Sequence, residues 1–301
     1  MSELRLATRR SPLALVQASL VQRRLLELGV ESVLVPLETK GDRHADVWLD
    51  EIGAQGVFAV EVQRAVMCGD ADVAIHSAKD LPSTTPDGLS LACVPERLDA
   101  ADVLIGRSLA GLGPGATVAT GSPRRRALLL ERRPDLRVVG IRGNMATRFA
   151  AAGRSDIDAV VVAAAALERL GEIELSAERL DTDWFVPQVG QGALALEVRV
   201  DDAATATVLA PLNQRDAMMA LVAERAFLSE LGAGCSVPCG AYATVSGDVT
   251  TIRGVMLSVD GTQSVRAVME GDDPLALGRT LALALRDEKG GGELAGWLRT
   301  S

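Results

Sequence analysis

The chain has 301 residues, a length that predicts two or three domains rather than one core. Apolar residues make up 48% of it and aromatic residues only 3%, so the predicted cores consist mainly of Ala, Val and Leu. The formal net charge of −9 argues against a general nucleic-acid binder, and apolar runs such as 159–167 are too short to span a bilayer.

The first part of the chain alternates predicted strands and helices. Ser11 stands where a helix N-cap belongs, Pro12 fits the first helical position, and Gly29 fits the C-cap. The predicted elements are a strand at 4–8, a helix at 12–28, a strand at 32–37, a helix at 57–68 and a short buried strand at 72–76. This alternation predicts an α/β fold with a mostly parallel sheet and helices on both faces.

The same unit recurs further along the chain. The segment ATRRSP (7–12) resembles ATGSPR (119–124), because in both a strand leads through a short Ser-Pro turn into a helix. The predicted elements of this second unit are strands at 117–120, 137–141 and 158–162 and helices at 123–132 and 145–152. We interpret the pattern as two similar α/β domains, although two common Ser-Pro caps can also match by accident.

The remaining chain predicts a return to the first domain and then a third, smaller domain. The Gly-rich segment 187–192 precedes a predicted strand at 193–200. A helix at 215–231, strands at 241–245, 250–257 and 264–269, and a closing helix at 274–286 follow. The predicted domains are 1–95 with 189–212, 96–188, and a small α+β domain at 213–301.

Basic charge is concentrated in one segment. From Thr120 to Arg154 there are nine Arg and two acidic residues, so this segment carries +7 and leaves −16 for the rest of the chain. The segment holds no Lys, and a general Arg bias of the protein explains that absence as well as function does. The local clustering still favours an anion site, because the planar guanidinium donates paired hydrogen bonds to carboxylates or phosphates.

Three turns are candidate anion sites. Helix N-termini attract negative charge, and Arg9, Arg124 and Arg125 stand beside the two Ser-Pro turns. Plain capping is the alternative; two such turns followed by an Arg-rich segment favour anion binding. The third turn, Arg142-Gly143-Asn144, is by itself better explained as an ordinary turn with Asn144 as N-cap.

Two further segments carry reactive side chains. In IHSAKD (75–80), Asp80 beside Lys79 is a candidate proton donor or counter-ion for a developing cation, and a loop salt bridge is the alternative. Cys235 lies in the flexible turn GAGCSVP (232–238), where a thiol is accessible for covalent chemistry.

The other cysteines predict no special chemistry. Cys68 and Cys93 are expected to be buried, and four cysteines give no sign of a disulfide framework. The pair Cys235 and Cys239 lacks nearby histidines, so no metal site is expected. The chain shows no signal-peptide pattern at its start, and a reducing cytoplasm is the expected location.

These segments together resemble the hydroxymethylbilane synthase (porphobilinogen deaminase) family over nearly the whole chain. The matching motifs, in order, are LATRRSPLAL (6–15), TKGD (39–42), AIHSAKDLP (74–82), ATGSPRRRALL (119–129), LRVVGIRGNMATR (136–148), LERLG (167–171), VGQGALALE (189–197), AERAFL (223–228) and GAGCSVPCGAYA (232–243). The HSAKD, RGN and GC-SVP motifs in this order are highly specific.

The resemblance implies two lobes like those of periplasmic anion-binding proteins, with the active site in the cleft between them, and a third domain bearing the cofactor cysteine. It implies a transferase that carries a dipyrromethane on a thioether to Cys235 and adds four porphobilinogen molecules to it, each losing ammonia. A cationic azafulvene forms on the way, and water releases the linear hydroxymethylbilane. Asp80 is the implied catalytic carboxylate. The implied residues that bind cofactor and substrate carboxylates are Arg9, Ser11, Phe58, Ser77, Lys79, Thr120, Gly121, Ser122, Arg124, Arg125, Arg142, Gly143, Asn144, Arg148, Arg169 and Gln191.

The chain departs from the family pattern at two places. Gln55 stands where many relatives carry Lys, which puts one contact to substrate carboxylates in doubt, whereas Phe58 is retained and is implied to pack on a pyrrole. Gly121 and Pro123 stand where other members often have Ser and Leu, so one hydroxyl donor is lost.

Two rival functions remain to be weighed. A non-enzymatic, two-lobed anion-binding protein would need neither Cys235 nor Asp80 and is usually exported. An Arg-rich nucleic-acid module is disfavoured by the acidic charge and the few aromatic residues. The expected partners are therefore porphobilinogen and the growing oligopyrrole, with no nucleic acid or membrane. We expect a monomer that hands its product to uroporphyrinogen-III synthase.

Overall fold

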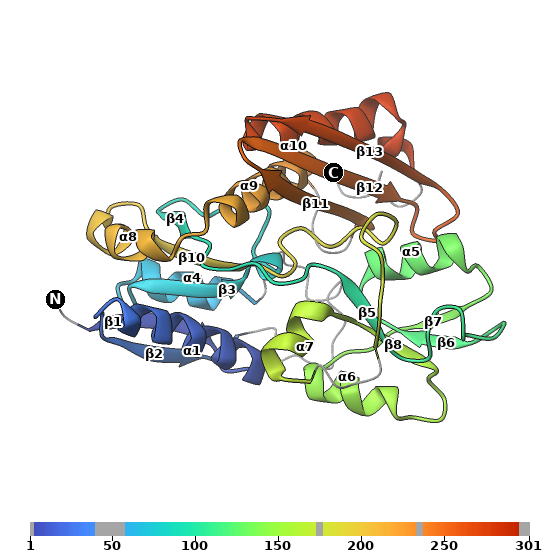
Figure 1. Ribbon diagram of the computed structural model, residues 1–301, viewed down its shortest axis with the longest axis horizontal. Helices are drawn as coiled ribbons and strands as arrows, with labels where there is room; N and C mark the ends of the chain where they lie inside the picture. The colour runs from blue at the N-terminus through green and yellow to red at the C-terminus, as the bar shows by residue number, and fades with distance from the viewer. Residues whose placement is uncertain (1–2, 40–57, 173–176, 233–236, 295–301) are drawn as a thin grey trace. The chain divides into compact units, whose positions relative to one another are not determined.

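The computed structural model describes residues 3–39, 58–172, 177–232 and 237–294 (Figure 1). The chain forms two compact units, one built from residues 1–98 and 192–218, the other from 99–191 and 219–301. In the described ranges, no helix combines the length and the apolar character needed to cross a membrane.

The first unit contains one five-stranded sheet with helices on both faces. Its elements are β1 (Leu4–Arg9), α1 (Pro12–Glu27), β2 (Ser32–Leu37), α4 (Val60–Met67), β3 (Val73–Ser77), the 3-10 turn η1 (Ala78–Asp80), β4 (Leu89–Cys93), β10 (Leu194–Arg199), α8 (Ala203–Leu209) and the 3-10 turn η2 (Ala210–Leu212). The strand order is β2-β1-β3-β10-β4. Strand β1 pairs in parallel with β2 and β3, while β10 runs antiparallel to β3 and β4.

Alternation along the strands separates two apolar layers in this unit. Leu6 and Ile75 pack with α1 and α8 on one face, and their neighbours Ala7 and Ala74 pack with α4 on the other. Helix α1 begins as predicted, because the Ser11 side chain accepts a hydrogen bond from the backbone N–H of Ala14 at 3.4 Å.

The second unit repeats this arrangement and adds a smaller layer. Its first elements are β5 (Asp102–Gly106), β6 (Thr117–Ala119), α5 (Pro123–Arg132), β7 (Arg137–Val139), α6 (Met145–Ala152), β8 (Ala159–Ala163), α7 (Ala164–Leu170) and β9 (Ala177–Arg179). The strand order β7-β6-β8-β5-β9 has the same pattern as the first sheet, with β5 antiparallel to its neighbours. The predicted similarity of two α/β lobes is therefore confirmed.

Four of the five strands in each sheet run in the same direction, as expected of a mostly parallel sheet, and one strand runs against them. The antiparallel strands β5 and β10 are the first strands after the chain passes from one unit to the other. They enter the sheets without a strand-helix-strand crossover, and only such a crossover makes neighbouring strands parallel.

The C-terminal part folds as a three-stranded antiparallel sheet with helices packed on it. Its elements are α9 (Arg215–Glu230), which begins in the first unit, then β11 (Cys239–Ser246), β12 (Val249–Leu257), β13 (Ser264–Gly271), α10 (Pro274–Leu283), the π turn η3 (Ala284–Glu288) and the 3-10 turn η4 (Gly291–Glu293). Phe227, Leu281 and Leu285 centre its core. Within the second unit, Val255 and Leu257 of β12 also join the core beside α5. A separate third domain at 213–301, and the predicted boundaries at 95, 188 and 212, stay predictions.

Candidate active site

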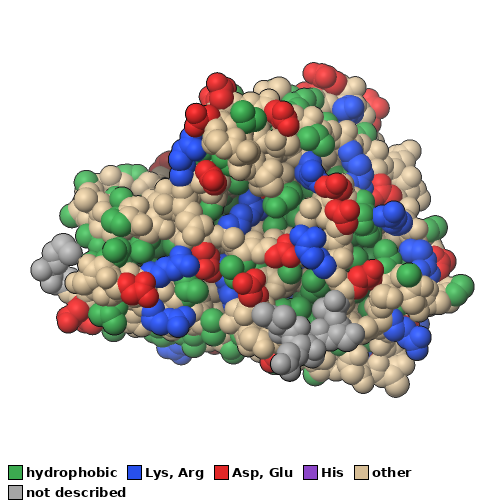
Figure 2. Space-filling model, viewed as in Figure 1, with side chains coloured by type: hydrophobic (Ala, Val, Ile, Leu, Met, Phe, Trp, Pro, Cys, Tyr) green, Lys and Arg blue, Asp and Glu red, His purple; other side chains and the backbone are tan. Residues whose placement is uncertain are grey.

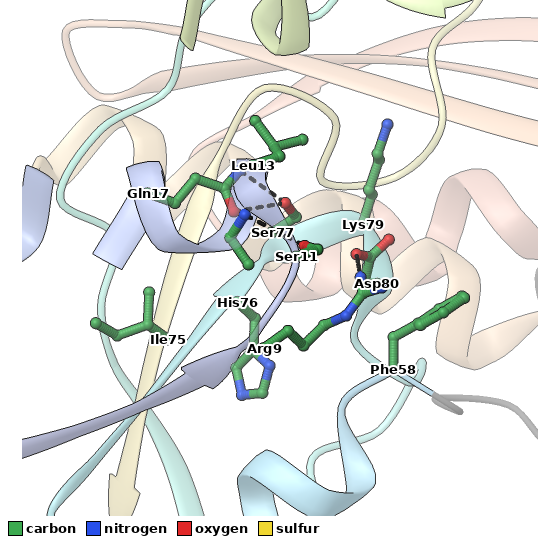
Figure 3. Close-up of a pocket in the computed structure, with 11 residues that line it drawn as sticks. Arg9, Ser11, Leu13, Gln17, Phe58, Ile75, His76, Ser77, Lys79 and Asp80 are labelled. Carbon is green, nitrogen blue, oxygen red and sulfur yellow. Dashed lines mark hydrogen bonds and ion pairs between the residues drawn. The ribbon is translucent and has the colours of Figure 1, made fainter. Parts of the chain in front are cut away.

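One pocket of the first unit gathers polar side chains from three elements (Figure 3). Arg9 ends β1, Ser11 caps α1, and Ser77 ends β3, so all three lie at the carboxyl edge of neighbouring parallel strands. The 3-10 turn that follows β3 adds Lys79 and Asp80. Ligands of open α/β sheets bind at this edge, which makes the pocket the candidate binding site.

Arg9, Asp80 and Phe58 form the most specific arrangement in this pocket. The Nη1 atom of Arg9 lies 3.4 Å from Oδ2 of Asp80, and its guanidinium lies 4.1 Å from the centre of the Phe58 ring. The side chains of Arg9 and Asp80 are 20% and 29% exposed, so both are reachable from the pocket. Figure 3 shows the guanidinium between the carboxylate and the ring, whereas the Lys79 side chain extends away from this pair.

Gln17 and His76 line the same pocket but were not predicted as site residues. Gln17 and Ser77 exchange hydrogen bonds of 2.8 and 3.1 Å between their side chains. His76 is buried, and its Nε2 atom lies 3.2 Å from the carboxylate of Glu197, which accepts a hydrogen bond from Gln63. Gln17 could have been found from the sequence, because it is a polar residue on the face of α1 that otherwise buries Ala14, Ala18, Val21 and Leu25.

The second unit contains the corresponding Ser-Pro turn at the start of α5. Ser122 accepts a hydrogen bond from the backbone N–H of Arg125 at 3.4 Å, and the buried Thr120 hydroxyl accepts one from the N–H of Ser122 at 3.2 Å. A Cβ atom at Gly121 would lie 2.6 Å from the carbonyl oxygen of Ile141. Glycine therefore permits a close backbone approach here.

Arg124 and Arg125 lie behind this turn rather than on its surface. Both are buried, and both pair with Asp102, the fully buried first residue of β5, at 2.7 and 2.6 Å. Gln191 is also fully buried, and its side chain donates to Asp102 at 2.9 Å and to the carbonyl of Ala100 at 2.7 Å. Direct contact of these three side chains with a ligand stays a prediction, and the contacts found here are with the protein itself.

The Arg142-Gly143-Asn144 turn has the predicted geometry. Asn144 caps α6 by accepting a hydrogen bond from the N–H of Thr147 at 3.1 Å. Gly143 has a φ of +102°, a backbone conformation that favours glycine. Arg148, one turn into the helix, donates to the carbonyl of Gly143 at 3.3 Å. Arg142, Arg148 and Arg169 of α7 are half-buried, and their roles in binding stay predictions.

Several arginines of the basic segment have acidic partners. Arg133 pairs with Asp135 at 2.7 Å and Arg154 with Asp156 at 2.6 Å. On the face shown in Figure 2, basic and acidic side chains are interspersed. Part of the arginine cluster thus serves local ion pairs, so the charge that it offers a ligand is smaller than +7.

The cysteines confirm one expectation and correct another. Cys93 is buried, but Cys68 is exposed, because α4 turns Val62, Ala65 and Val66 inward and ends just before Cys68. Cys235 and Gln55 lie outside the described residues.

The pocket chemistry fits an anionic ligand that also carries a flat ring and an N–H group. Two cationic groups, two hydroxyl groups and the N-terminus of α1 are suited to carboxylates. Phe58 offers an apolar ring face, and one carboxylate, Asp80, is suited to an N–H group or a developing positive charge.

Comparisons with known proteins agree with this chemistry. The family model described as "Porphobilinogen deaminase, dipyromethane cofactor binding domain" matches residues 4–207, and that described as "Porphobilinogen deaminase, C-terminal domain" matches residues 218–287. The curated "Porphobilinogen deaminase" of Syntrophotalea carbinolica is 46% identical over 89% of this chain and 87% of its own length. That of Trichlorobacter lovleyi is 44% identical over 93% and 91%.

Solved structures with similar folds are more distant. A periplasmic substrate-binding protein of an ABC transporter from Coxiella burnetii is 13% identical, with a TM-score of 0.43 over 70% of this chain and 92% of its own. A nutrient-binding protein from Burkholderia cenocepacia bound to methionine is 16% identical, with a TM-score of 0.41 over 69% and 90%.

Proposed function

Because this chain belongs to the porphobilinogen deaminase family, we propose that it is a hydroxymethylbilane synthase with Cys235 as the attachment residue of its dipyrromethane. This transferase condenses four porphobilinogen molecules in turn, with loss of ammonia, and hydrolysis then releases the linear tetrapyrrole. The observation that carries the proposal is the first-unit pocket, which places the single carboxylate of Asp80 among cationic and hydroxyl donors.

The residues of this pocket have different proposed roles according to their charge and polarity. Arg9, Lys79, Ser11 and Ser77 bind pyrrole carboxylates through charge-assisted hydrogen bonds. Phe58 packs against a pyrrole ring and keeps water from one of its faces. The rival function, anion binding without catalysis, accounts for the cationic donors but not for a carboxylate that faces the same pocket.

Asp80 is the proposed catalytic residue. Its carboxylate accepts a hydrogen bond from a pyrrole N–H and stabilises the positive charge that develops when ammonia leaves. Because Arg9 lies 3.4 Å away, the Asp80 carboxylate is held in place, yet it remains open to the pocket. When bound, the dipyrromethane supplies the pyrrole carbon from which the chain grows.

The second unit is proposed to bind further carboxylates. The donors are the Thr120-Gly121-Ser122 turn at the start of α5 and the Arg142-Gly143-Asn144 turn at the start of α6, with Arg148 and Arg169 nearby in the sequence. Arg124, Arg125 and Gln191 support the first turn from behind, because Asp102 engages all three.

Intact-mass spectrometry tests the function. The purified protein is expected to exceed its sequence mass of 31.5 kDa by one dipyrromethane, either as isolated or after incubation with porphobilinogen, and to give the colour reaction of linked pyrroles. Cys235→Ser should stay unmodified, whereas the matched Cys68→Ser, at an exposed thiol, should load normally. A wild-type protein that neither gains mass nor consumes porphobilinogen contradicts the proposal.

Location and partners complete the proposal. The free thiols at Cys68 and Cys93 support a reducing compartment, for which we propose the cytoplasm. The enzyme is proposed to act as a monomer and to hand its product to uroporphyrinogen-III synthase. Sedimentation of the purified protein, with and without that synthase, tests both points.

A further inference from the structure

A buried carboxylate organises the first turn of α5 from behind. The Oδ2 atom of Asp102 accepts a hydrogen bond from Nη2 of Arg124 at 2.7 Å. Its Oδ1 atom accepts from Nη2 of Arg125 at 2.6 Å and from Nε2 of Gln191 at 2.9 Å. One further donor of each guanidinium reaches a backbone carbonyl: Nη1 of Arg124 donates to Val186 at 2.7 Å and Nη1 of Arg125 to Val161 at 3.0 Å.

This cluster carries an excess of positive charge. Burial alone would raise the pKa of Asp102, but the charges of Arg124 and Arg125 and their hydrogen bonds hold it below its usual value. The carboxylate is therefore ionised and neutralises one of the two buried guanidinium groups. One positive charge remains in an interior of low dielectric, directly behind the turn that contains Thr120 and Ser122.

A purely structural explanation accounts poorly for this arrangement. Buried ion pairs seldom stabilise a fold more than apolar side chains of similar volume, because desolvation offsets the attraction between the charges. Here a third charged group adds to the desolvation penalty. The geometry is also closely fixed: the Arg124 guanidinium lies 5.7 Å from the Phe185 ring centre, and a Cβ atom at Gly240 of β11 would lie 3.1 Å from Cδ of Arg124.

We propose that Asp102 is a positioning residue for carboxylate binding at the 120–122 turn, because it fixes both arginines behind the turn while leaving one positive charge there. The hydroxyl groups of the turn are thereby held ready for an anionic substituent. This role rests on the proposed function, since it presumes that the turn binds pyrrole carboxylates.

Asp102→Asn separates positioning from simple charge neutralisation, because the two roles predict opposite changes in the KM for porphobilinogen. The substitution raises the net charge of the cluster from +1 to +2, so electrostatics alone would lower the KM for porphobilinogen. Loss of positioning should instead raise KM about tenfold and slow dipyrromethane loading of the apoprotein, followed by intact mass, by a similar factor. A lowered KM, or an unchanged KM and loading rate in a folded variant, overturns the proposal.

Glu131→Gln is the matched control. Glu131 lies at the other end of α5 from the 120–122 turn and, like Asp102, is the acidic partner of an arginine. Glu131 pairs with Arg266 and accepts a hydrogen bond from Ser264. This variant is expected to lower the melting temperature without changing KM or the loading rate. If its KM rises as much as that of Asp102→Asn, any disturbance of α5 has the same effect and the proposal fails.

Gln191→Met provides a second test if Asp102→Asn does not fold. It removes one neutral donor to Asp102 and leaves all three charges in place. KM is expected to rise about threefold, in the direction expected for Asp102→Asn. An unchanged KM overturns the proposal. Each experiment includes the wild-type protein. If the wild type gains no mass from porphobilinogen, the proposed function has failed, and not this inference.

Discussion

Asp80 combines two properties that a catalytic carboxylate needs. It is fixed, through Arg9 and the short turn after β3, and it faces the pocket with 29% of its side chain exposed. A loop salt bridge was the alternative from sequence, and the ion pair with Arg9 exists. Its position among the pocket donors favours the catalytic role all the same.

Asp80→Asn is expected to keep the fold and lose most turnover. The amide retains the shape of the side chain but cannot stabilise a positive charge, so kcat for porphobilinogen should fall roughly 10²–10⁴-fold. The rate of porphobilinogen consumption and the melting temperature measure the two effects. Asp87→Asn, at an exposed turn position nearby, should behave as the wild type. Normal turnover in Asp80→Asn would remove this residue from the mechanism.

The thiols of Cys68 and Cys93 are expected to differ sharply in reactivity. Burial raises the pKa of Cys93 to about 12, so very little thiolate forms near neutral pH. Cys68 is exposed and should react with iodoacetamide in the native protein, whereas Cys93 should react only after unfolding. Peptide mass mapping after brief alkylation distinguishes the two sites. Rapid native labelling of Cys93 would mean that the first-unit core opens readily.

At the scale of single elements, the repeated Ser-Pro turn connects sequence to structure most directly. Ser11 and Ser122 both cap their helices, with Pro12 and Pro123 as first helical residues. The second turn differs in having Gly121 where the family often has Ser. The space around this glycine explains why the hydroxyl group cannot simply be restored.

Gly121→Ser is expected to destabilise the protein despite matching the common family residue. The new Cβ atom would lie 2.6 Å from the carbonyl oxygen of Ile141, so either the turn or the segment that follows β7 must shift. The free energy of unfolding, measured in urea, should fall by about 1–3 kcal/mol. Gly113→Ser is the matched control, since no atom lies within 4 Å of its Cβ position. Equal stability of both variants would show that the turn adapts freely.

The parts of the fold that were predicted are those with strong local signals. Helix caps and apolar periodicity located α1, α5 and α10 to within a few residues. The strands β4, β5 and β9 and the helices α7 and α8 were missed, because each is only three to seven residues long. In the site, the Ser-Pro turns and Asn144 followed from local rules. The pairing of Asp102 with Arg124 and Arg125 did not, because it depends on a contact across more than twenty positions that only tertiary structure creates.

At the scale of the whole molecule, ion pairs are expected to make stability sensitive to acid. Burial alone would raise the pKa of Asp72, but hydrogen bonds and charge from Arg5 lower it; Asp99 beside Arg179 and Asp102 are lowered in the same way. A carboxyl group whose pKa is lowered by folding stabilises the native state above its unfolded pKa of about 3.9. That contribution is lost as the pH falls further, through the folded pKa.

The melting temperature should therefore fall steeply below about pH 4, and Asp72→Asn should show a shallower fall there. Scanning calorimetry between pH 3 and 7 measures both. Asp72→Asn removes one group that takes up a proton on acid unfolding, so the slopes should differ even if the variant is less stable at neutral pH. Identical slopes would mean that Asp72 has the same proton affinity in both states.

The passage of the chain between the two units also constrains how the protein is made. Strand β10 lies between β3 and β4 in the first sheet, yet it comes from residues 194–199. While a ribosome is still making the second lobe, the emerging N-terminal segment has β3 and β4 with no strand between them, and their unpaired backbone groups invite association with other chains. The first lobe can close only after about two-thirds of the polypeptide has left the ribosome, so nascent chains should depend on chaperones, or on rapid translation, up to that point.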